Sequence, residues 1–178
     1  MKFSVDEIPQ SPKEIRFSEN LTDLDEIYRR SRNREFGFPS VLAVELTYYR
    51  SGQDIIFHGR LNGGLSARCG RCLEDFYFDL DKSFDLVLTP KPGASGRRAE
   101  ELSRDELDLS YYSTDEIDMS PFIAEQVLLA LPTRPLCMEN CRGLCGGCGA
   151  NLNAKSCSCS VAAGDPRMAI FRTLKVGR

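Results

Sequence analysis

Eight cysteines, six of them crowded between Cys137 and Cys159, constrain this chain more than any other feature of its sequence. The spacing is a pair at Cys69-x2-Cys72, a long gap, and then Cys137-x3-Cys141-x3-Cys145-x2-Cys148-x8-Cys157-x-Cys159. The N-terminal residues carry neither an apolar signal core nor an Arg- and Ser-rich transit segment. We therefore expect a cytoplasmic protein in a reducing compartment, where clustered cysteines indicate metal binding rather than disulfides.

The eight thiols divide into two sets of four, which is the number of tetrahedral ligands that zinc prefers. Glycines surround the Cys-x2-Cys turns, as a zinc knuckle requires. One expected site consists of Cys145, Cys148, Cys157 and Cys159. The other consists of Cys69, Cys72, Cys137 and Cys141, and it would join a β-rich segment to the C-terminal tail (residues 134–178). Exchange of Cys137 and Cys141 with the other set stays open, because this partition is a hypothesis from spacing alone.

Two other interpretations of the cysteines fit less well. The Cys69/Cys72 pair resembles a redox dithiol, but thiol oxidoreductases place such a pair between a strand and a helix, and residues 73–80 look extended. Inert free thiols would not gather six in so short a segment. A closed four-thiolate site leaves no position for water, so the metal would be structural and would not hydrolyse a substrate.

The pattern of apolar residues predicts an α+β fold. Branched and aromatic residues separated by turn residues such as Asn62-Gly63-Gly64 predict a mostly antiparallel sheet that is possibly barrel-like. The expected strands are 41–49, 55–61, 65–68, 76–80, 84–88 and 107–112. The expected helices are 24–34, a covering helix at 120–131 with Pro121 in its first turn and Pro132 after it, and a short C-terminal helix from Asp165.

Composition divides the chain into two parts. Residues 1–133 form the expected β-rich domain, interrupted by a flexible loop at 90–104 that is rich in Pro, Gly, Ser, Arg and Glu. Residues 134–178 form the expected Cys-rich zinc module with the C-terminal helix. No apolar run is long enough to cross a membrane, so we expect no membrane partner.

Charge favours a local nucleic-acid contact over a general one. The net charge is −3 and the pI about 5.3, which excludes a polycation that coats RNA with its whole surface. Residues 134–178, however, hold seven basic and two acidic side chains. An Arg run beside Tyr28 and Phe36 suits phosphate contact and base stacking, although a solvated helix face paired with nearby acids is the simpler explanation of the run alone. The candidate RNA-binding residues are Arg29, Arg30, Arg32, Arg34, Arg68, Arg71, Arg142 and Lys155.

Nothing in the sequence assembles a catalytic site. His58 is the single histidine and lies in a strand pattern, where an ordinary sheet side chain is the simpler interpretation. The acidic residues between Glu100 and Asp118 surround a loop and are more simply solvent-exposed. We therefore expect no enzyme, no catalytic residue and no small-molecule substrate.

Several motifs together resemble the YceD-like large ribosomal RNA subunit accumulation proteins of bacteria and plastids. They are Cys69-Gly-Arg-Cys72-Leu-Glu, the segment from Leu128 to Pro132, Cys141-Arg-Gly-Leu-Cys145-Gly-Gly-Cys148-Gly-Ala-Asn-Leu-Asn153, and Asp165-Pro-Arg167. The resemblance covers the chain from about Val41 onward. It implies a role in accumulation or processing of 23S ribosomal RNA during large-subunit assembly, and no defined active site.

Two hypotheses of different classes follow. The first is a non-catalytic factor whose zinc-ordered tail presents Arg side chains to 23S rRNA or its precursor. The alternative is a zinc-stabilised adaptor that recruits a ribonuclease or a ribosomal protein without touching RNA. Direct phosphate contact predicts an affinity that falls steeply with salt, which distinguishes the two.

Overall fold

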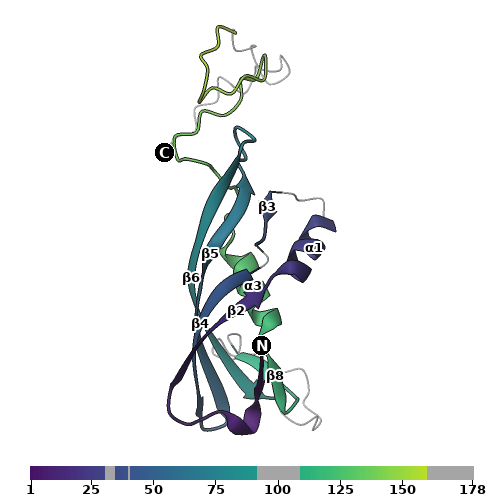
Figure 1. The fold of residues 1–178 in the computed structure, drawn as a ribbon, viewed down its shortest axis with the longest axis vertical. Helices are drawn as coiled ribbons and strands as arrows, with labels where there is room; N and C mark the ends of the chain where they lie inside the picture. The colour runs from purple at the N-terminus through teal and green to yellow at the C-terminus, as the bar shows by residue number, and fades with distance from the viewer. Residues whose placement is uncertain (31–34, 40, 92–108, 160–178) are drawn as a thin grey trace, which may run out of the picture.

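The protein is described from a computed structural model, which covers residues 1–30, 35–39, 41–91 and 109–159. The predicted C-terminal helix, most of the predicted loop at 90–104, and Arg32 and Arg34 lie outside these residues. In Figure 1 a long β-hairpin runs along the molecule, and the Cys-rich segment lies beyond its tip. The N-terminal strand lies toward the opposite end.

The main sheet has six strands in the order β2-β4-β5-β6-β7, with β3 paired to β5 alongside this path. Every pairing is antiparallel except that of β6 with β7. The strands are β2 (Lys13–Asn20), β3 (Phe36–Gly37), β4 (Val41–Ser51), β5 (Asp54–Arg68), β6 (Asp75–Pro90) and β7 (Leu109–Tyr112). A tight turn at Gly52, whose φ is +63°, joins β4 to β5. The predicted antiparallel α+β fold is thus confirmed.

The sheet is not closed, so the prediction of a barrel is wrong. β2 and β7 are its two edges and do not pair with each other. A separate two-stranded sheet, β1 (Lys2–Ser4) with β8 (Glu116–Asp118), lies against the core instead. With helix α3 (Ser120–Ala130) it supplies apolar side chains that cover the sheet's inner face, so the sheet need not curl onto itself.

Alternation of apolar and polar residues explains which face of the sheet is buried. On β4, Leu42, Val44, Leu46 and Tyr48 are buried, whereas Ala43 and Glu45 between them are exposed. The helix α3 packs onto this inner face, and its Ile123 and Val127 are both 0% exposed. It ends one residue earlier than predicted, because Leu131, which precedes Pro132, is extended.

The N-terminal residues belong to the core, although no strand was predicted before residue 41. Phe3, Val5 and Ile8 are buried in the main core, around β1 and the short 3-10 helix η1 (Val5–Glu7). The helix α1 (Thr22–Arg30) begins two residues before the predicted one. Neither helix in the described part of the chain has the length and apolar run that a membrane crossing needs.

A glycine on β5 makes room for an aromatic ring on β6. Gly59 pairs with Phe84, and a Cβ added to Gly59 would lie 2.2 Å from the Phe84 ring. Gly64 on the same strand has only Tyr77 near its Cβ position, at 3.8 Å, which is ordinary van der Waals contact. The two glycines therefore differ in packing and not in secondary structure.

We predict that Gly59→Ala destabilises the protein and that Gly64→Ala does not. The methyl group at residue 59 must displace the buried Phe84 ring, which costs about 1–3 kcal/mol of unfolding free energy by analogy with other overpacked cores. Urea unfolding of the two metal-loaded variants measures this difference. Equal midpoints for both variants would show that the ring does not depend on the missing Cβ.

Candidate metal centres

The structure gathers the eight cysteine sulfurs into two groups of four. Within each group all four Sγ atoms lie within 4.8 Å of one another. The first group is Cys69, Cys72, Cys137 and Cys141, and the second is Cys145, Cys148, Cys157 and Cys159. This grouping is the one that the spacing indicated, without the exchange that was left open.

The first group joins the tip of the hairpin to the tail. Cys69 and Cys72 lie between the end of β5 and the start of β6, and Cys137 and Cys141 come from the segment after α3. The Sγ atoms of Cys69 and Cys141 are 3.7 Å apart, and those of Cys72 and Cys137 are 3.6 Å apart. Three of these cysteines are buried, with Cys137 partly so, which shields the group from water.

The second group lies entirely within the tail and is more open to solvent. The Sγ of Cys157 is 3.4 Å from that of Cys148 and 3.5 Å from that of Cys145. Cys148 and Cys159 are exposed. The second group therefore organises the tail itself, whereas the first attaches the tail to the sheet.

Both Cys-x2-Cys turns have the same hydrogen bonds. In the second, Gly147 N–H donates to Cys145 Sγ at 3.4 Å and Gly149 N–H to the Cys145 carbonyl at 2.9 Å. In the first, Arg71 N–H donates to Cys69 Sγ at 3.5 Å and Leu73 N–H to the Cys69 carbonyl at 3.0 Å. Gly149 has a φ of +73°, and Leu73 adopts a φ of 61°, which costs a side-chain-bearing residue about 1–3 kcal/mol.

The donor sets fit a tetrahedral metal ion. With metal–sulfur bonds of about 2.3 Å, the sulfurs of a zinc site lie about 3.8 Å apart, close to the 3.6 and 3.7 Å found in the first group. A disulfide would need about 2.05 Å. Four protein ligands also fill the coordination shell, so neither group would leave a position for a reacting water.

The thiols of each group cannot easily ionise together. Burial raises the pKa of Cys69, but hydrogen bonds from nearby backbone N–H groups outweigh it and lower the pKa to about 6. Hydrogen bonds from the backbone of Cys148 and Gly147 lower the pKa of Cys145 to about 6 as well. Burial and the neighbouring sulfurs raise the pKa of Cys137 to about 12. A cation at the centre would remove this conflict by stabilising all four thiolates.

Backbone contacts hold the tail on the hairpin tip in addition to the sulfurs. Gly70 N–H donates to the Pro135 carbonyl at 2.8 Å, and Leu144 N–H donates to the Arg71 carbonyl at 3.2 Å. The Arg71 guanidinium donates to the carbonyls of Cys141 at 2.9 Å and Glu139 at 3.4 Å. Arg71, a predicted RNA-binding residue, therefore has a structural role in docking the tail.

The other predicted RNA-binding residues that the structure describes do not all lie together, although Arg29 and Arg68 line one hollow of about 510 Å³. Arg29 and Arg30 on α1 pair with Asp25 and Glu26 at 2.7 and 3.5 Å. Arg68 makes a two-pronged contact with Asp75. Arg142 and Lys155 lie exposed in the tail, and neither has an ion pair among the described residues. Figure 1 shows α1 beside the sheet and the tail beyond the hairpin tip.

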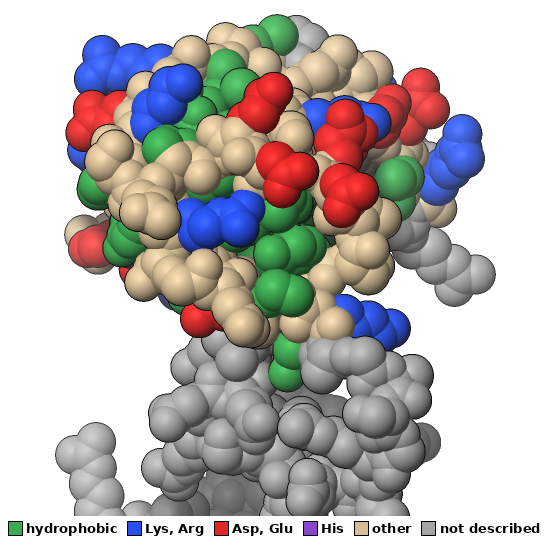
Figure 2. Space-filling view, turned by 90° about the horizontal axis from the view of Figure 1, so that it is seen from below, with side chains coloured by type: hydrophobic (Ala, Val, Ile, Leu, Met, Phe, Trp, Pro, Cys, Tyr) green, Lys and Arg blue, Asp and Glu red, His purple; other side chains and the backbone are tan. Residues whose placement is uncertain are grey.

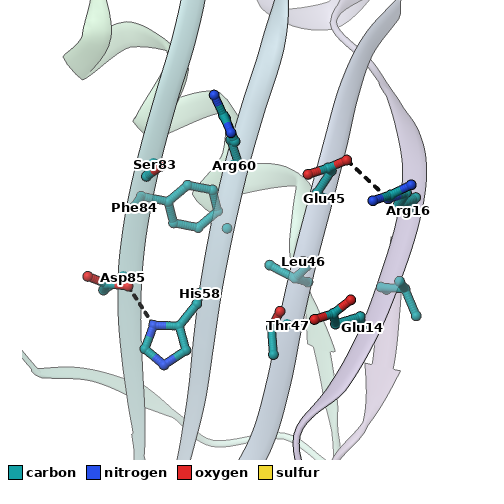
Figure 3. Close-up of a pocket in the computed structure, with 12 residues that line it drawn as sticks. Glu14, Arg16, Glu45, Leu46, Thr47, His58, Arg60, Ser83, Phe84 and Asp85 are labelled. Carbon is teal, nitrogen blue, oxygen red and sulfur yellow. Dashed lines mark hydrogen bonds and ion pairs between the residues drawn. The ribbon is translucent and has the colours of Figure 1, made fainter.

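On the outer face of the sheet, basic and acidic side chains pair across neighbouring strands. Figure 3 shows His58 beside Asp85 and Arg16 beside Glu45, joined across strands at 2.6 and 3.0 Å. Arg60 makes a two-pronged contact with Asp81 at 2.6 and 2.7 Å. A hollow of about 420 Å³ lies over this face, and its lining includes His58, Asp85, Arg16, Glu45 and Arg60. Because Arg16 and Arg60 each have a carboxylate partner, this part of the face offers little attraction to phosphate.

The end of the molecule opposite the cysteines is also mixed in charge. Figure 2 views this end, and it shows single Lys and Arg side chains separated by Asp and Glu side chains and by apolar ones. Lys2 on β1 and Glu116 on β8 form an ion pair at 2.8 Å. Among the described residues in this view, no basic patch is visible.

Asn153 was not among the site residues predicted from the sequence. Its side-chain amide donates to the Sγ of Cys141 at 3.2 Å, although the two residues belong to different parts of the tail. A usable signal was present, because Asn151 and Asn153 directly follow the second Cys-x2-Cys turn, and Asn side chains commonly hydrogen-bond nearby backbone in such turns.

Comparison with known proteins shows to which family the chain is similar. The family model described as "Large ribosomal RNA subunit accumulation protein YceD" matches residues 57–175, from β5 through the cysteine groups. No solved structure matches the chain.

Curated relatives come from plants and from a bacterium. Two are named "Large ribosomal RNA subunit accumulation protein YCED homolog 1, chloroplastic". The one from Zea mays is 30% identical over 145 residues, covering 68% of this chain and 48% of the relative. The one from Arabidopsis thaliana is 27% identical over 144 residues, covering 69% and 44%.

An uncharacterized protein of Mycobacterium leprae, ML1660, is 24% identical over 118 residues, covering 66% of this chain and 51% of the relative. The chain thus spans about half the length of the curated relatives that it matches. Because the family model covers most of the chain, including both cysteine groups, this protein belongs to the YceD family of large ribosomal RNA subunit accumulation proteins.

Proposed function

We propose that the protein is a non-catalytic factor that supports 23S rRNA accumulation or processing during large-subunit assembly. The observation that carries this proposal is the family match over residues 57–175, since the family is named for accumulation of the large-subunit ribosomal RNA. The matched segment holds the hairpin and all eight cysteines. We infer a cytoplasmic location for this work, and the two plant relatives are named as chloroplastic.

Zinc is the metal that we propose for both groups. Four thiolates suit a soft or borderline ion, and zinc forms closed four-thiolate sites without redox chemistry. In this role the first zinc fixes the tail on the hairpin tip and the second gives the tail its shape. Neither ion would take part in a reaction, which agrees with a factor that binds rather than catalyses.

Direct RNA contact is the mechanism that we propose, and the eight candidate residues differ in how available they are. Arg29, Arg30 and Arg68 already have carboxylate partners. A phosphate would have to displace those carboxylates. The exposed Arg142 and Lys155 are therefore the stronger candidates among the described residues. They are also needed to attract RNA, because each zinc with four thiolates carries a net charge of −2.

Loss of the first metal centre should destabilise the whole protein. We expect Cys69→Ser with Cys72→Ser to bind one zinc fewer and to unfold at lower urea concentration, because the tail loses its attachment to the hairpin. Cys148→Ser with Cys157→Ser is the matched control, and it should lose one zinc with a smaller change in the midpoint. Native mass spectrometry counts the metal. An unchanged zinc content and midpoint in the first variant would refute the attachment.

Loss of the exposed cations should weaken RNA binding. We expect Arg142→Gln with Lys155→Gln to lower the crosslinking of 23S segments in cells. In purified protein it should reduce the slope of log affinity against log salt by about 1 for each phosphate contact removed. Lys2→Gln with Arg16→Gln, which removes two cations far from the tail, should change neither.

Two other outcomes redirect the proposal. Loss of crosslinks only in Arg29→Gln with Arg30→Gln would move the contact to α1. No enrichment of 23S segments with folded, metal-loaded protein would refute direct RNA contact. The adaptor hypothesis, in which the protein recruits a ribonuclease or a ribosomal protein, would then replace it.

A further inference from the structure

The loop that the second cysteine group closes reaches back to the first group. Residues 149–156 lie between Cys148 and Cys157, whose sulfurs are 3.4 Å apart. Within this loop, Asn153 donates its side-chain amide to the Sγ of Cys141 at 3.2 Å. A residue positioned by one group therefore contacts a sulfur of the other.

The orientation of the Asn153 amide is fixed. Its Oδ1 accepts a hydrogen bond from the backbone N–H of Arg142 at 2.7 Å, directly beside Cys141. The NH₂ group must then face the sulfur, and a rotation of the amide by 180° would place an oxygen against it. The hydrogen bond from Arg142 N–H thus orients the Asn153 amide so that its NH₂ group donates to the Sγ of Cys141.

The loop around Asn153 is held by further hydrogen bonds. Asn153 N–H donates to Asn151 Oδ1 at 2.9 Å, and Asn151 Nδ2 donates to Glu74 on the hairpin tip at 3.3 Å. Leu152 N–H donates to the Gly143 carbonyl at 2.9 Å. Because these hydrogen bonds hold residues 151–153, the position of the Asn153 side chain is set by how the chain folds between the two cysteine groups.

The sulfur that receives the hydrogen bond is buried. Cys141 is 3% exposed, whereas Asn153 is exposed, so the Asn153 amide lies between this buried sulfur and solvent. A hydrogen bond to a metal-bound thiolate stabilises the charged form of the ligand, and such outer contacts typically change metal affinity by about 10–100-fold. The structure thus gives Asn153 a direct means to influence the first metal centre.

We propose that Asn153 couples the two metal centres: the loop closed by the second centre presents the Asn153 amide to Cys141 and strengthens metal binding at the first centre. The inference rests on the metal part of the proposed function. Because coupling between two binding sites is reciprocal, metal at the first centre strengthens binding at the second by the same factor. Attachment of the tail to the sheet then depends on both ions.

Asn153→Asp in the full chain tests the hydrogen bond. The carboxylate keeps the shape of the side chain and an acceptor for Arg142 N–H, but it has no donor for the sulfur. We expect the zinc affinity of the first centre, measured by competition with a chromophoric chelator, to fall by about 10–100-fold. Cadmium-113 NMR, in which the two centres give separate signals, assigns the loss to the first centre.

Asn140→Asp is the control, because it adds the same charge at an exposed position between Cys137 and Cys141. It should leave the affinity of the first centre nearly unchanged. Asn153→Ala removes the donor without adding charge and should weaken the first centre as well, which keeps the test valid if Asn153→Asp folds poorly. Equal affinities for Asn153→Asp and Asn140→Asp, with two ions bound, would overturn the coupling and leave the proposed metal centres intact.

A double-mutant cycle tests the coupling itself. Cys148→Ser with Cys157→Ser should weaken the first centre, and adding Asn153→Asp to it should cause little further loss, since the loop no longer presents the amide. Losses that simply multiply would overturn the coupling. Wild-type protein that binds no stoichiometric metal would overturn the metal centres together with it.

Discussion

The position of the tail on the sheet depends on a group of four cysteine sulfurs at the tip of the β5–β6 hairpin. Cys69 and Cys72 come from the hairpin tip and Cys137 and Cys141 from the segment after α3, so the group closes a long loop of chain. The backbone contacts of Gly70 and Arg71 to the tail are few and lie next to these sulfurs. Without the sulfur group, the described part of the tail would be held to the hairpin tip by the hydrogen bonds of Gly70, Arg71 and Glu74.

Charged side chains are paired differently in the sheet and in the tail. On the outer face of the sheet, pairs such as Arg60 with Asp81 lie on neighbouring strands, so cations and carboxylates neutralise one another locally. At the hairpin tip and in the tail, two groups of four cysteine sulfurs could each hold a metal ion. The sheet thus pairs its charges within the chain, whereas Arg142 and Lys155 in the tail are exposed.

The sequence was sufficient for the features that follow local rules. Alternation predicted β4, Pro121 and Pro132 predicted the position of α3, and cysteine spacing predicted the grouping of the sulfurs. The turn predicted at Asn62-Gly63-Gly64 is wrong, because β5 runs unbroken from Asp54 to Arg68. The sequence was insufficient where distant segments decide the outcome. The pairing of β1 with β8 depends on contacts between residues far apart in the chain, and so does the docking of the tail by Arg71. Neither the sheet's open edges nor these contacts can be read from local patterns. Asn153 was missed because an Asn after a turn usually serves its own backbone.

The pairing of β1 with β8 has a consequence for the order of folding during synthesis. Lys2 meets Glu116 across 114 positions of sequence, and Phe3 lies between Tyr48 and Phe57 in the core. β1 leaves the ribosome well before β8, because its partner strand is synthesised more than a hundred residues later. Contacts of such long range form slowly, because a large loop must close first. β1 therefore reaches its final place only long after it has been made.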